Sequence, residues 1–291
     1  GLEIEALLKE HEKTLANIAE YNEILSNRAA MAKVIIRELE AYKKEYGRPR
    51  RTVIDNLKEA VVEEKKIEEM DVFLMDRFGY AKTIDMAAYE RNREAADAEN
   101  RYVLTCKNTD KICIFTNKGQ MHLLKVLDLP FGKFRDKGTP IDNLSNYNSS
   151  EENFVYITNL GAICNHKLIF GTKMAMLKIV DGSEFDVAKR TTAATKLTDG
   201  DEVLLVHPVA GNETIVMQSE RDFFLRIAVD SIPEKKKGAV GVRGMRLADG
   251  DALTAIHLLG EGESVQTEVK GKSVMLNRLH VAGRDTKGTK K

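Results

Sequence analysis

Cysteine is scarce in this 291-residue sequence, which has three cysteines and no CxxC pair. An odd number of cysteines without metal-ligand spacing argues against a disulfide framework and against a zinc site. It favours a protein of a reducing, cytoplasmic compartment. We therefore expect Cys106, Cys113 and Cys164 to act as small buried apolar residues.

Long apolar runs are also absent. No stretch approaches the roughly 18 apolar residues that a membrane-spanning helix needs. The first residues do not resemble a secretory signal. The sequence therefore predicts a protein with no membrane partner.

Patterns for metals and nucleotides are missing as well. The six histidines show no HxxxH spacing, so no metal site is predicted. The glycine-rich stretch 238–244 (GAVGVRG) lacks both the GxGxxG order and the Lys-Ser/Thr pair of a P-loop. The Asp-Gly-Asp sequences at 199–201 and 249–251 lack the rest of a calcium loop and are predicted to be turns. We expect no cofactor and no catalytic residue in this chain.

The net charge of zero hides an asymmetry between the two parts of the chain. Residues 1–100 contain 17 Lys and Arg against 22 Asp and Glu, whereas residues 101–291 contain 28 against 23. A modest basic excess in the second part is compatible with nucleic-acid binding but does not demand it.

Residues 2–46 are predicted to form a long helix of coiled-coil type. Spacings of four and three alternate along its stripe: Ile4, Leu8, His11, Leu15, Ile18, Asn22 and Leu25. The pattern slips at Ser26 and Asn27, and Gly47 and Pro49 end it. Such a stripe needs a partner, and no second helix of matching length follows. The partner is expected in a missing segment or on another subunit, and a generic dimerising coiled coil is the alternative.

From about residue 71, short runs of Val, Ile, Leu, Phe and Thr alternate with Gly, Asn and Asp, which is typical of antiparallel strands. Residues 71–79 (DVFLMDRFG) resemble 110–119 (DKICIFTNKG), and weaker copies begin near Asn165, Asn212 and Glu263. A period of about 50 residues with several strands in each repeat indicates propeller-like blades. The fold class predicted is mainly β, with about five repeats after a helical segment.

A second pattern follows each hairpin: a loop with nearby cations, a leucine, a turn and an apolar strand. It recurs over residues 137–157, 191–206 and 241–259. The fifth repeat reaches only 283–288 and is predicted to be incomplete, or completed by a strand from elsewhere. The charged connection 48–70, with its run EEKK at 63–66, is interpreted as a solvated linker.

These features resemble a known family. Residues 20–25 (EYNEIL), 37–39 (REL) and 46–52 (YGRPRRT) are similar to the coiled-coil arm of the A subunit of DNA gyrase and topoisomerase IV. Residues 115–119 (FTNKG), with the Leu-Pro and Lys-Gly sequences beyond them, resemble a blade of the same subunit's C-terminal β-pinwheel. The resemblance covers essentially the whole chain.

The resemblance implies a coiled-coil arm at 1–47, a linker at 48–70 and a β-pinwheel DNA-binding domain at 71–291. In this family the DNA-cleaving tyrosine lies upstream of the arm and ATP binds to the separate B subunit. The parent protein is thus expected to be an ATP-dependent isomerase, and this chain alone to be inactive. The partners implied are double-stranded DNA, the B subunit and a second A subunit joined through the core, in the bacterial cytoplasm at the nucleoid.

Cations that recur in the loops are the predicted DNA-binding residues, since equivalent loops of stacked blades share a rim that can follow a phosphate backbone. The alternative is that these side chains simply face water. The predicted residues are Arg135, Lys137, Lys189, Arg190, Lys235, Lys236, Lys237, Arg243, Arg246, Arg284 and Lys287.

One departure from the family bears on function. The first blade of gyrase carries a basic, glycine-rich box, whereas the matching residues 89–99 (YERNREAADAE) have no glycine and several acids. Acids repel phosphate, and a tight turn is difficult without glycine. We therefore expect a topoisomerase IV-like role in strand passage. A gyrase-type wrapping domain for negative supercoiling and a protein-interaction or spacer module remain the alternatives.

Overall fold

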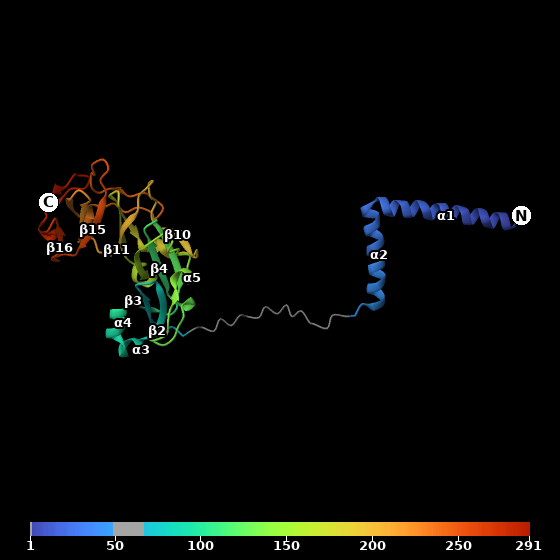
Figure 1. Ribbon diagram of the computed structural model, residues 1–291, viewed down its shortest axis with the longest axis horizontal. Coiled ribbons are helices and arrows are strands. Elements are labelled where there is room, and N and C mark those ends of the chain that lie inside the picture. The colour runs from blue at the N-terminus through green and yellow to red at the C-terminus, as the bar shows by residue number, and fades with distance from the viewer. Residues whose placement is uncertain (1, 49–66) are drawn as a thin grey trace. The chain divides into compact units, whose positions relative to one another are not determined.

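The computed structural model describes residues 2–48 and 67–291, which fall into two compact units (Figure 1). The helical unit comprises Gly1–Glu64 and the β unit Lys65–Lys291. Each is described by itself. Most of the predicted linker, with its EEKK run, and the end of the arm resemblance lie outside the described residues.

The helical unit contains α1 (Leu2–Ser26) and α2 (Arg28–Tyr46), which meet in a sharp bend (Figure 1). The prediction of one continuous helix over residues 2–46 is therefore wrong at Asn27, where the apolar pattern slips and the helix is interrupted. Asn27 is extended, and its side chain accepts a hydrogen bond from the backbone N–H of Ala29 at 3.0 Å. Asparagine is a favoured N-cap because its side chain satisfies an amide that the new helix leaves unpaired.

The apolar stripe of the helical unit is exposed. Ile4, Leu8, Leu15, Ile18 and Leu25 are each at least half accessible to solvent. A helix with such a stripe gains most of its stability from packing against a partner. In the part of the chain that the structure describes, α1 has no helix along this face.

The β unit is built from hairpins in antiparallel register. Their strands are β1 (Met70–Asp76) with β2 (Tyr80–Asp85), β4 (Lys111–Thr116) with β5 (Gln120–Lys125), β8 (Lys167–Thr172) with β9 (Met176–Asp181), β12 (Thr214–Ser219) with β13 (Phe223–Ala228), and β16 (Gln266–Val269) with β17 (Lys272–Met275). The five hairpins coincide with the five predicted repeats.

A third strand from the same repeat pairs with the first strand of each of the first four hairpins. These outer strands are β3 (Asn100–Lys107), β7 (Phe154–Asn159), β11 (Val203–Val209) and β15 (Leu253–Leu259). Three strands of one repeat thus form most of a blade. The Asp-Gly-Asp turns precede β11 and β15 as predicted, and the buried Asp201 accepts hydrogen bonds from the amides of Met174 and Glu202.

The fourth strand of each blade comes from the following repeat. The exchanged strands are β6 (Thr139–Pro140) on β2, β10 (Thr191–Ala193) on β5, β14 (Val242–Arg243) on β9, and β18 (Val281–Ala282) with β19 (Thr289–Lys290) on β13. Each loop that carries an exchanged strand is one of the cation-bearing loops of the sequence pattern. Strand exchange therefore ties each of the four blades to the next repeat.

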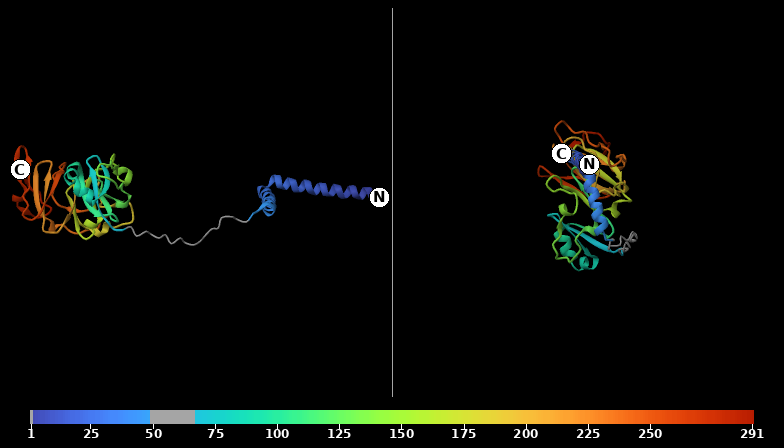
Figure 2. Two further views of the ribbon diagram at one scale, coloured as in Figure 1. Left: turned by 90° about the horizontal axis from the view of Figure 1, so that it is seen from below. Right: turned by 90° about the vertical axis from the view of Figure 1, so that its right-hand side faces the viewer.

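Among the described residues, four of the five hydrophobic clusters join successive repeats, and the remaining one, with Val72, Ile84 and Tyr89, lies within the first blade. Phe115 of the second blade packs edge-to-face on Phe170 of the third at 5.9 Å between ring centroids, and Phe185 completes the cluster. A second core joins the third and fourth blades through Leu177 and Met217. The sheets follow one another around an arc (Figures 1 and 2).

The fifth repeat contributes its hairpin and the strands β18 and β19, and within the described residues its hairpin pairs with no further strand. Its apolar side packs on the fourth blade through Val269 and Leu276. In the same described part, no hydrogen-bonded ladder joins this hairpin to the sheet of β1.

Short helices connect the strands. A 3₁₀ turn follows the second hairpin strand of the later repeats (Val126–Asp128, Gly182–Phe185, Val229–Ser231 and Leu276–Arg278), and α5 (Ile141–Leu144) and α6 (Leu160–Ile163) are single turns. The first repeat instead has α3 (Met86–Arg91) and α4 (Arg93–Glu99), which the sequence reading did not anticipate. None of the described helices combines the length and apolarity required to cross a lipid bilayer.

Two of the three cysteines are buried as predicted, and Cys164 is half-buried. Burial raises the pKa of the Cys106 thiol to about 12, and it also raises the pKa of Cys113. Thiols so shifted stay protonated at neutral pH and are poor nucleophiles.

Candidate nucleic-acid interface

The exchanged strands bring the predicted cations to equivalent places in different blades. Thr139, Thr192, Val242 and Thr289 each pair with the second residue of a second hairpin strand: Ala81, Met121, Leu177 and Phe224. Counting from these pairs places every loop residue in a common register. Two residues before the pair stand Lys137, Arg190, Val240 and Lys287. Three of the four blades therefore present a cation at the same place.

Close backbone contact fixes this register. A Cβ atom on Gly138, Gly241 or Gly288 would lie 2.6 Å from the carbonyl oxygen of Ala81, Leu177 or Phe224, respectively. Real Cβ atoms do not approach so closely, so the backbone geometry of these three loops requires glycine at this place. In the second blade Thr191 takes this place, and its Oγ1 lies 2.9 Å from Nδ1 of His122.

Two of the register cations lie over aromatic rings. Lys137 Nζ is 4.8 Å from the ring centroid of Tyr80, and Lys287 Nζ is 5.1 Å from that of Phe223. Tyr80 and Phe223 are the first residues of β2 and β13 and so occupy equivalent positions. A cation over a ring gains about 0.5–1 kcal/mol at an exposed site, which holds the lysine while its charge stays in solvent.

The arginines of the third and fourth loops meet around one acid. The Asp285 carboxylate lies 3.6 Å from Arg243 and 3.7 Å from Arg246, and the Arg246 guanidinium also donates to the Asp285 carbonyl at 3.1 Å. Arg284 donates to the Arg243 carbonyl at 2.9 Å. Exposed pairs of this kind stabilise a protein by about 0–1 kcal/mol, so a phosphate can compete for these arginines.

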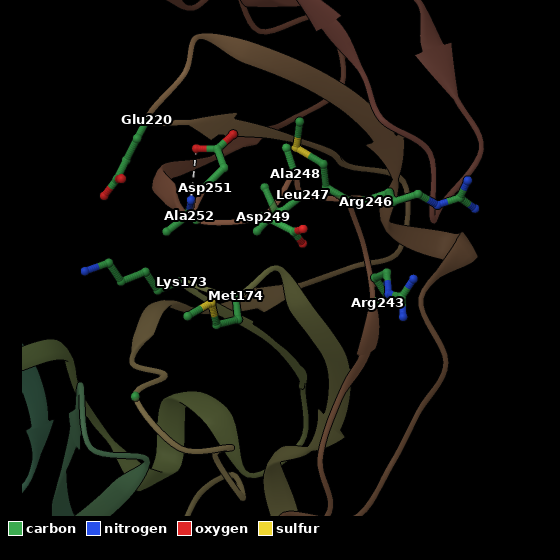
Figure 3. Close-up of a pocket in the computed structure, with 13 residues that line it drawn as sticks. Lys173, Met174, Glu220, Arg243, Arg246, Leu247, Ala248, Asp249, Asp251 and Ala252 are labelled. Atoms are coloured by element: carbon green, nitrogen blue, oxygen red, sulfur yellow. Dashed lines mark hydrogen bonds between the residues drawn. The ribbon is translucent and has the colours of Figure 1, made fainter.

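An open groove of about 650 Å³ lies beside these arginines, between the third and fourth blades. Figure 3 shows Lys173 and Glu220 at one end of it and Arg243 and Arg246 at the other. Asp251 turns inward and accepts a hydrogen bond from the Ala252 amide at 2.9 Å. With acids and cations mixed along its walls, the groove is no uniform anion channel, and its arginine end is the part suited to phosphate.

The remaining predicted cations are distributed unevenly. Lys189 and Arg190 line a smaller basic groove that also includes Lys111 and Lys125, two cations that the sequence reading did not single out. Arg190 donates to the Leu144 carbonyl at 3.0 Å. Arg135 and Lys236 are exposed, whereas Lys235 and Lys237 are half-buried. Lys237 Nζ donates to the Glu184 carbonyl at 3.0 Å, so it faces the blade more than solvent.

The second hairpin strands also contain polar residues that hold the loops, and the sequence reading missed them. Lys82, Lys178 and Arg226 each donate to two or more backbone carbonyls of an exchanged loop or the turn before it. His122 in the second blade bonds Glu152 at 2.6 Å as well as Thr191. Each of these charged residues stands among apolar residues of its strand, and a buried charge needs a hydrogen-bond partner. This pattern in the sequence could have predicted that they bind a neighbouring segment.

Residues 89–99, where the family resemblance places the basic box, form the helical insertion of the first blade. Asp85 caps α3 by accepting from the Ala88 amide at 2.6 Å, and the Tyr89 hydroxyl donates to Asp97 at 2.7 Å. Arg93 pairs with Glu90 three residues earlier at 2.5 Å. The insertion is thus a self-paired helical hairpin rather than a glycine loop.

Comparison with known proteins shows what two of the repeats resemble. A family model described as "DNA gyrase C-terminal domain, beta-propeller" matches residues 166–210 and 213–259, which span the repeats that begin at β8 and β12. The DNA gyrase A subunit of Lawsonia intracellularis is 29% identical over 99% of this chain. The DNA gyrase A subunit of Staphylococcus epidermidis is 26% identical over 100% of this chain. The chain is therefore similar to the C-terminal part of bacterial DNA gyrase A subunits. It spans 37% and 35% of the length of these two relatives.

Solved structures show the same fold. The C-terminal domain of a DNA topoisomerase IV superposes on 76% of this chain, and on 72% of its own, with a TM-score of 0.68 at 20% identity. The E. coli ParC C-terminal domain covers 77% of this chain and 94% of its own at a TM-score of 0.64 and 12% identity. A DNA gyrase A C-terminal domain superposes on 76% of this chain, and on 76% of its own, with a TM-score of 0.51 at 17% identity. These likenesses bear out the predicted β-pinwheel.

Proposed function

We propose that the β unit binds duplex DNA along the rim formed by its exchanged loops, as a non-catalytic module of a type IIA topoisomerase A subunit. The observation that carries this proposal is the common register of Lys137, Arg190 and Lys287. A cation repeated at one place in successive blades follows a curved phosphate backbone without reading base sequence. In the full enzyme the module would present a duplex to ATP-dependent strand passage, with the B subunit and a second A subunit as partners.

Within this family we favour a topoisomerase IV-like role. Its support is the first blade, where a helical hairpin with paired charges stands at residues 86–99. A chiral wrap of DNA would need phosphate contacts at this end of the arc, and acids there oppose them. The gyrase-type wrapping function is the second candidate, favoured by the similarity of the chain to curated DNA gyrase A subunits.

A gel-shift titration with a matched pair of variants tests DNA binding. Changing Lys137, Arg190 and Lys287 to glutamine should weaken binding and lower the slope of log K against log salt by about 0.9 for each lost phosphate contact. The control changes Lys107, Lys118 and Lys272, which are exposed but lie outside the exchanged loops, to glutamine. An equal loss in both variants would reduce the effect to net charge and remove the assigned rim.

A linking-number assay then separates the two roles. Plasmid is relaxed in the presence of the chain, and its topoisomers are compared with those of a protein-free control. Binding without a shift supports the topoisomerase IV-like role, whereas a clear shift toward positive writhe assigns the gyrase-type wrap. Absence of binding would favour a spacer module.

A further inference from the structure

Lys178 is a lysine buried inside the β unit. It lies in the middle of β9 and is 1% exposed. Its Nζ donates to the carbonyls of Lys236, Lys237 and Ala239 at 3.1, 2.9 and 2.9 Å. An ammonium group has three N–H donors, so each finds one acceptor. In the described part of the chain Lys178 makes no ion pair within 4 Å, and its bonds go to this one loop.

These bonds determine how the loop presents its own lysines. The loop first runs beside β9, where the Lys235 amide donates to the Ile179 carbonyl at 2.8 Å. It then turns, and the Ala239 amide donates to the Lys236 carbonyl at 3.0 Å. Because Lys178 holds three carbonyls inward, the backbone is fixed around it while the Lys236 side chain stays exposed.

We propose that Lys178 is a positioning residue for DNA binding, which holds the basic loop 235–239 in the shape that meets phosphate. The inference rests on the proposed function of the rim. Lys178 itself is enclosed, so its ammonium group is not presented to phosphate. It acts through the loop, because a fixed loop loses less conformational freedom when DNA orders its lysines.

The first blade has the same arrangement. Lys82 stands at the register position of Lys178, and its Nζ donates to the carbonyls of Phe134 and Asp136, the latter at 2.7 Å. These two carbonyls flank Arg135, another predicted DNA-binding residue. In the fourth blade Leu225 takes this register position, and the neighbouring Arg226 binds the carbonyls of Asn277 and Leu279 instead.

A double-mutant cycle on the full chain tests the inference, with a random-sequence duplex as the probe. In the unchanged background, Lys178→Met should weaken binding about tenfold, the effect of roughly one phosphate contact near 0.1 M salt. Methionine keeps an unbranched apolar side chain of nearly the same length but removes the ammonium group with its three donors. In a background where Lys235, Lys236 and Lys237 are glutamine, the same change should alter affinity less than about twofold, since non-additivity marks residues that act together.

Each failure has a distinct meaning. If the three glutamines alone leave binding unchanged, this loop is not part of the rim and the proposed function fails there. If they weaken binding but Lys178→Met does not, or if the two effects simply add, the positioning role is wrong. Hydrogen exchange of the loop amides should rise in Lys178→Met and not in Lys272→Met. If Lys178→Met does not fold, the same cycle is run in the first blade. Lys82→Met then replaces Lys178→Met, and Arg135→Gln with Lys137→Gln replaces the three loop glutamines. The same outcomes support or overturn the positioning role there.

Discussion

Some positions of the exchanged loops require glycine, whereas neighbouring positions have room for a side chain. Gly241 lies against the β9 backbone, and its position would leave a Cβ atom 2.6 Å from the Leu177 carbonyl oxygen and 2.8 Å from two further backbone atoms. Gly238, three residues earlier in the same loop, has open space around it. One loop therefore contains both a required glycine and a permissive one.

We predict that Gly241→Ala destabilises the β unit and that Gly238→Ala does not. Overpacking against backbone that cannot move aside costs about 1–3 kcal/mol. Thermal unfolding followed by circular dichroism measures the difference between the two variants. Equal melting temperatures for both would show that β14 is not held on β9 as described.

Burial also changes the chemistry of Lys178. Desolvation lowers its pKa from 10.5 to about 8, with Glu184 opposing the shift and Lys235 adding to it. A lysine with a lowered folded-state pKa binds fewer protons in the fold than in the unfolded chain between these two values. Its penalty on stability is fully present below about pH 8 and disappears as the pH rises toward 10.5.

We therefore predict that the native chain becomes more stable relative to Lys178→Met as the pH is raised from 8 to 10. Melting temperatures of the two proteins, measured at the same series of pH values, give the difference directly, because titrations elsewhere cancel. A difference that stays constant over this range would mean that Lys178 keeps an ordinary pKa in the fold.

Single strands of the β unit depend on segments from the next repeat. The β13 edge of the fourth blade is covered by β18 and β19, which flank the predicted cations Arg284 and Lys287. Phe223 pairs with Lys290 and Phe224 with Thr289. An unpaired strand edge exposes its amides to solvent and to other chains.

Removing residues 283–291 should therefore loosen the fourth blade and leave the first blade intact. Hydrogen exchange of the amides of β13 is expected to rise, whereas that of β2, which is covered by β6, stays unchanged and serves as the internal control. Unaltered exchange in β13 would show that the exchanged segment does not protect this strand.

At the scale of the whole molecule, the two units carry different features. The helical unit has an exposed apolar stripe, and the β unit carries the predicted DNA-binding cations. Phosphate contacts cause the salt dependence of DNA binding. The unit that makes these contacts should therefore keep, when isolated, both the affinity for DNA and the slope of log K against log salt.

We expect residues 67–291 alone to bind duplex DNA with nearly the affinity and salt slope of the full chain, and residues 1–48 alone not to bind. Fluorescence anisotropy at several salt concentrations compares the three proteins. A marked loss of affinity in residues 67–291 would assign part of the interface to the rest of the chain.

Much of the architecture followed from the sequence because it depends on local patterns. Alternating apolar runs and turn residues give the hairpins, and their recurrence gives the repeats. The bend at Asn27 coincides with the slip in the apolar stripe, since a helix with a shifted stripe cannot keep one face on one partner. Gly79 and Gly119 mark their turns in the sequence because glycine readily adopts positive φ. Ala175 and Asp222 also adopt positive φ, +62° and +65°, but the sequence does not predict it because these residue types rarely do.

The tertiary structure alone decided which strand completes which blade. The exchanged strands are two or three residues long, too short for any periodic signal, and they pair with hairpin residues 55 to 73 positions earlier in the chain. That pairing aligns Lys137, Arg190 and Lys287, sets Asp285 between two arginines, and encloses Lys178 beneath the loop that it holds. Sequence spacing places cations in loops, but only long-range backbone contact puts them in register.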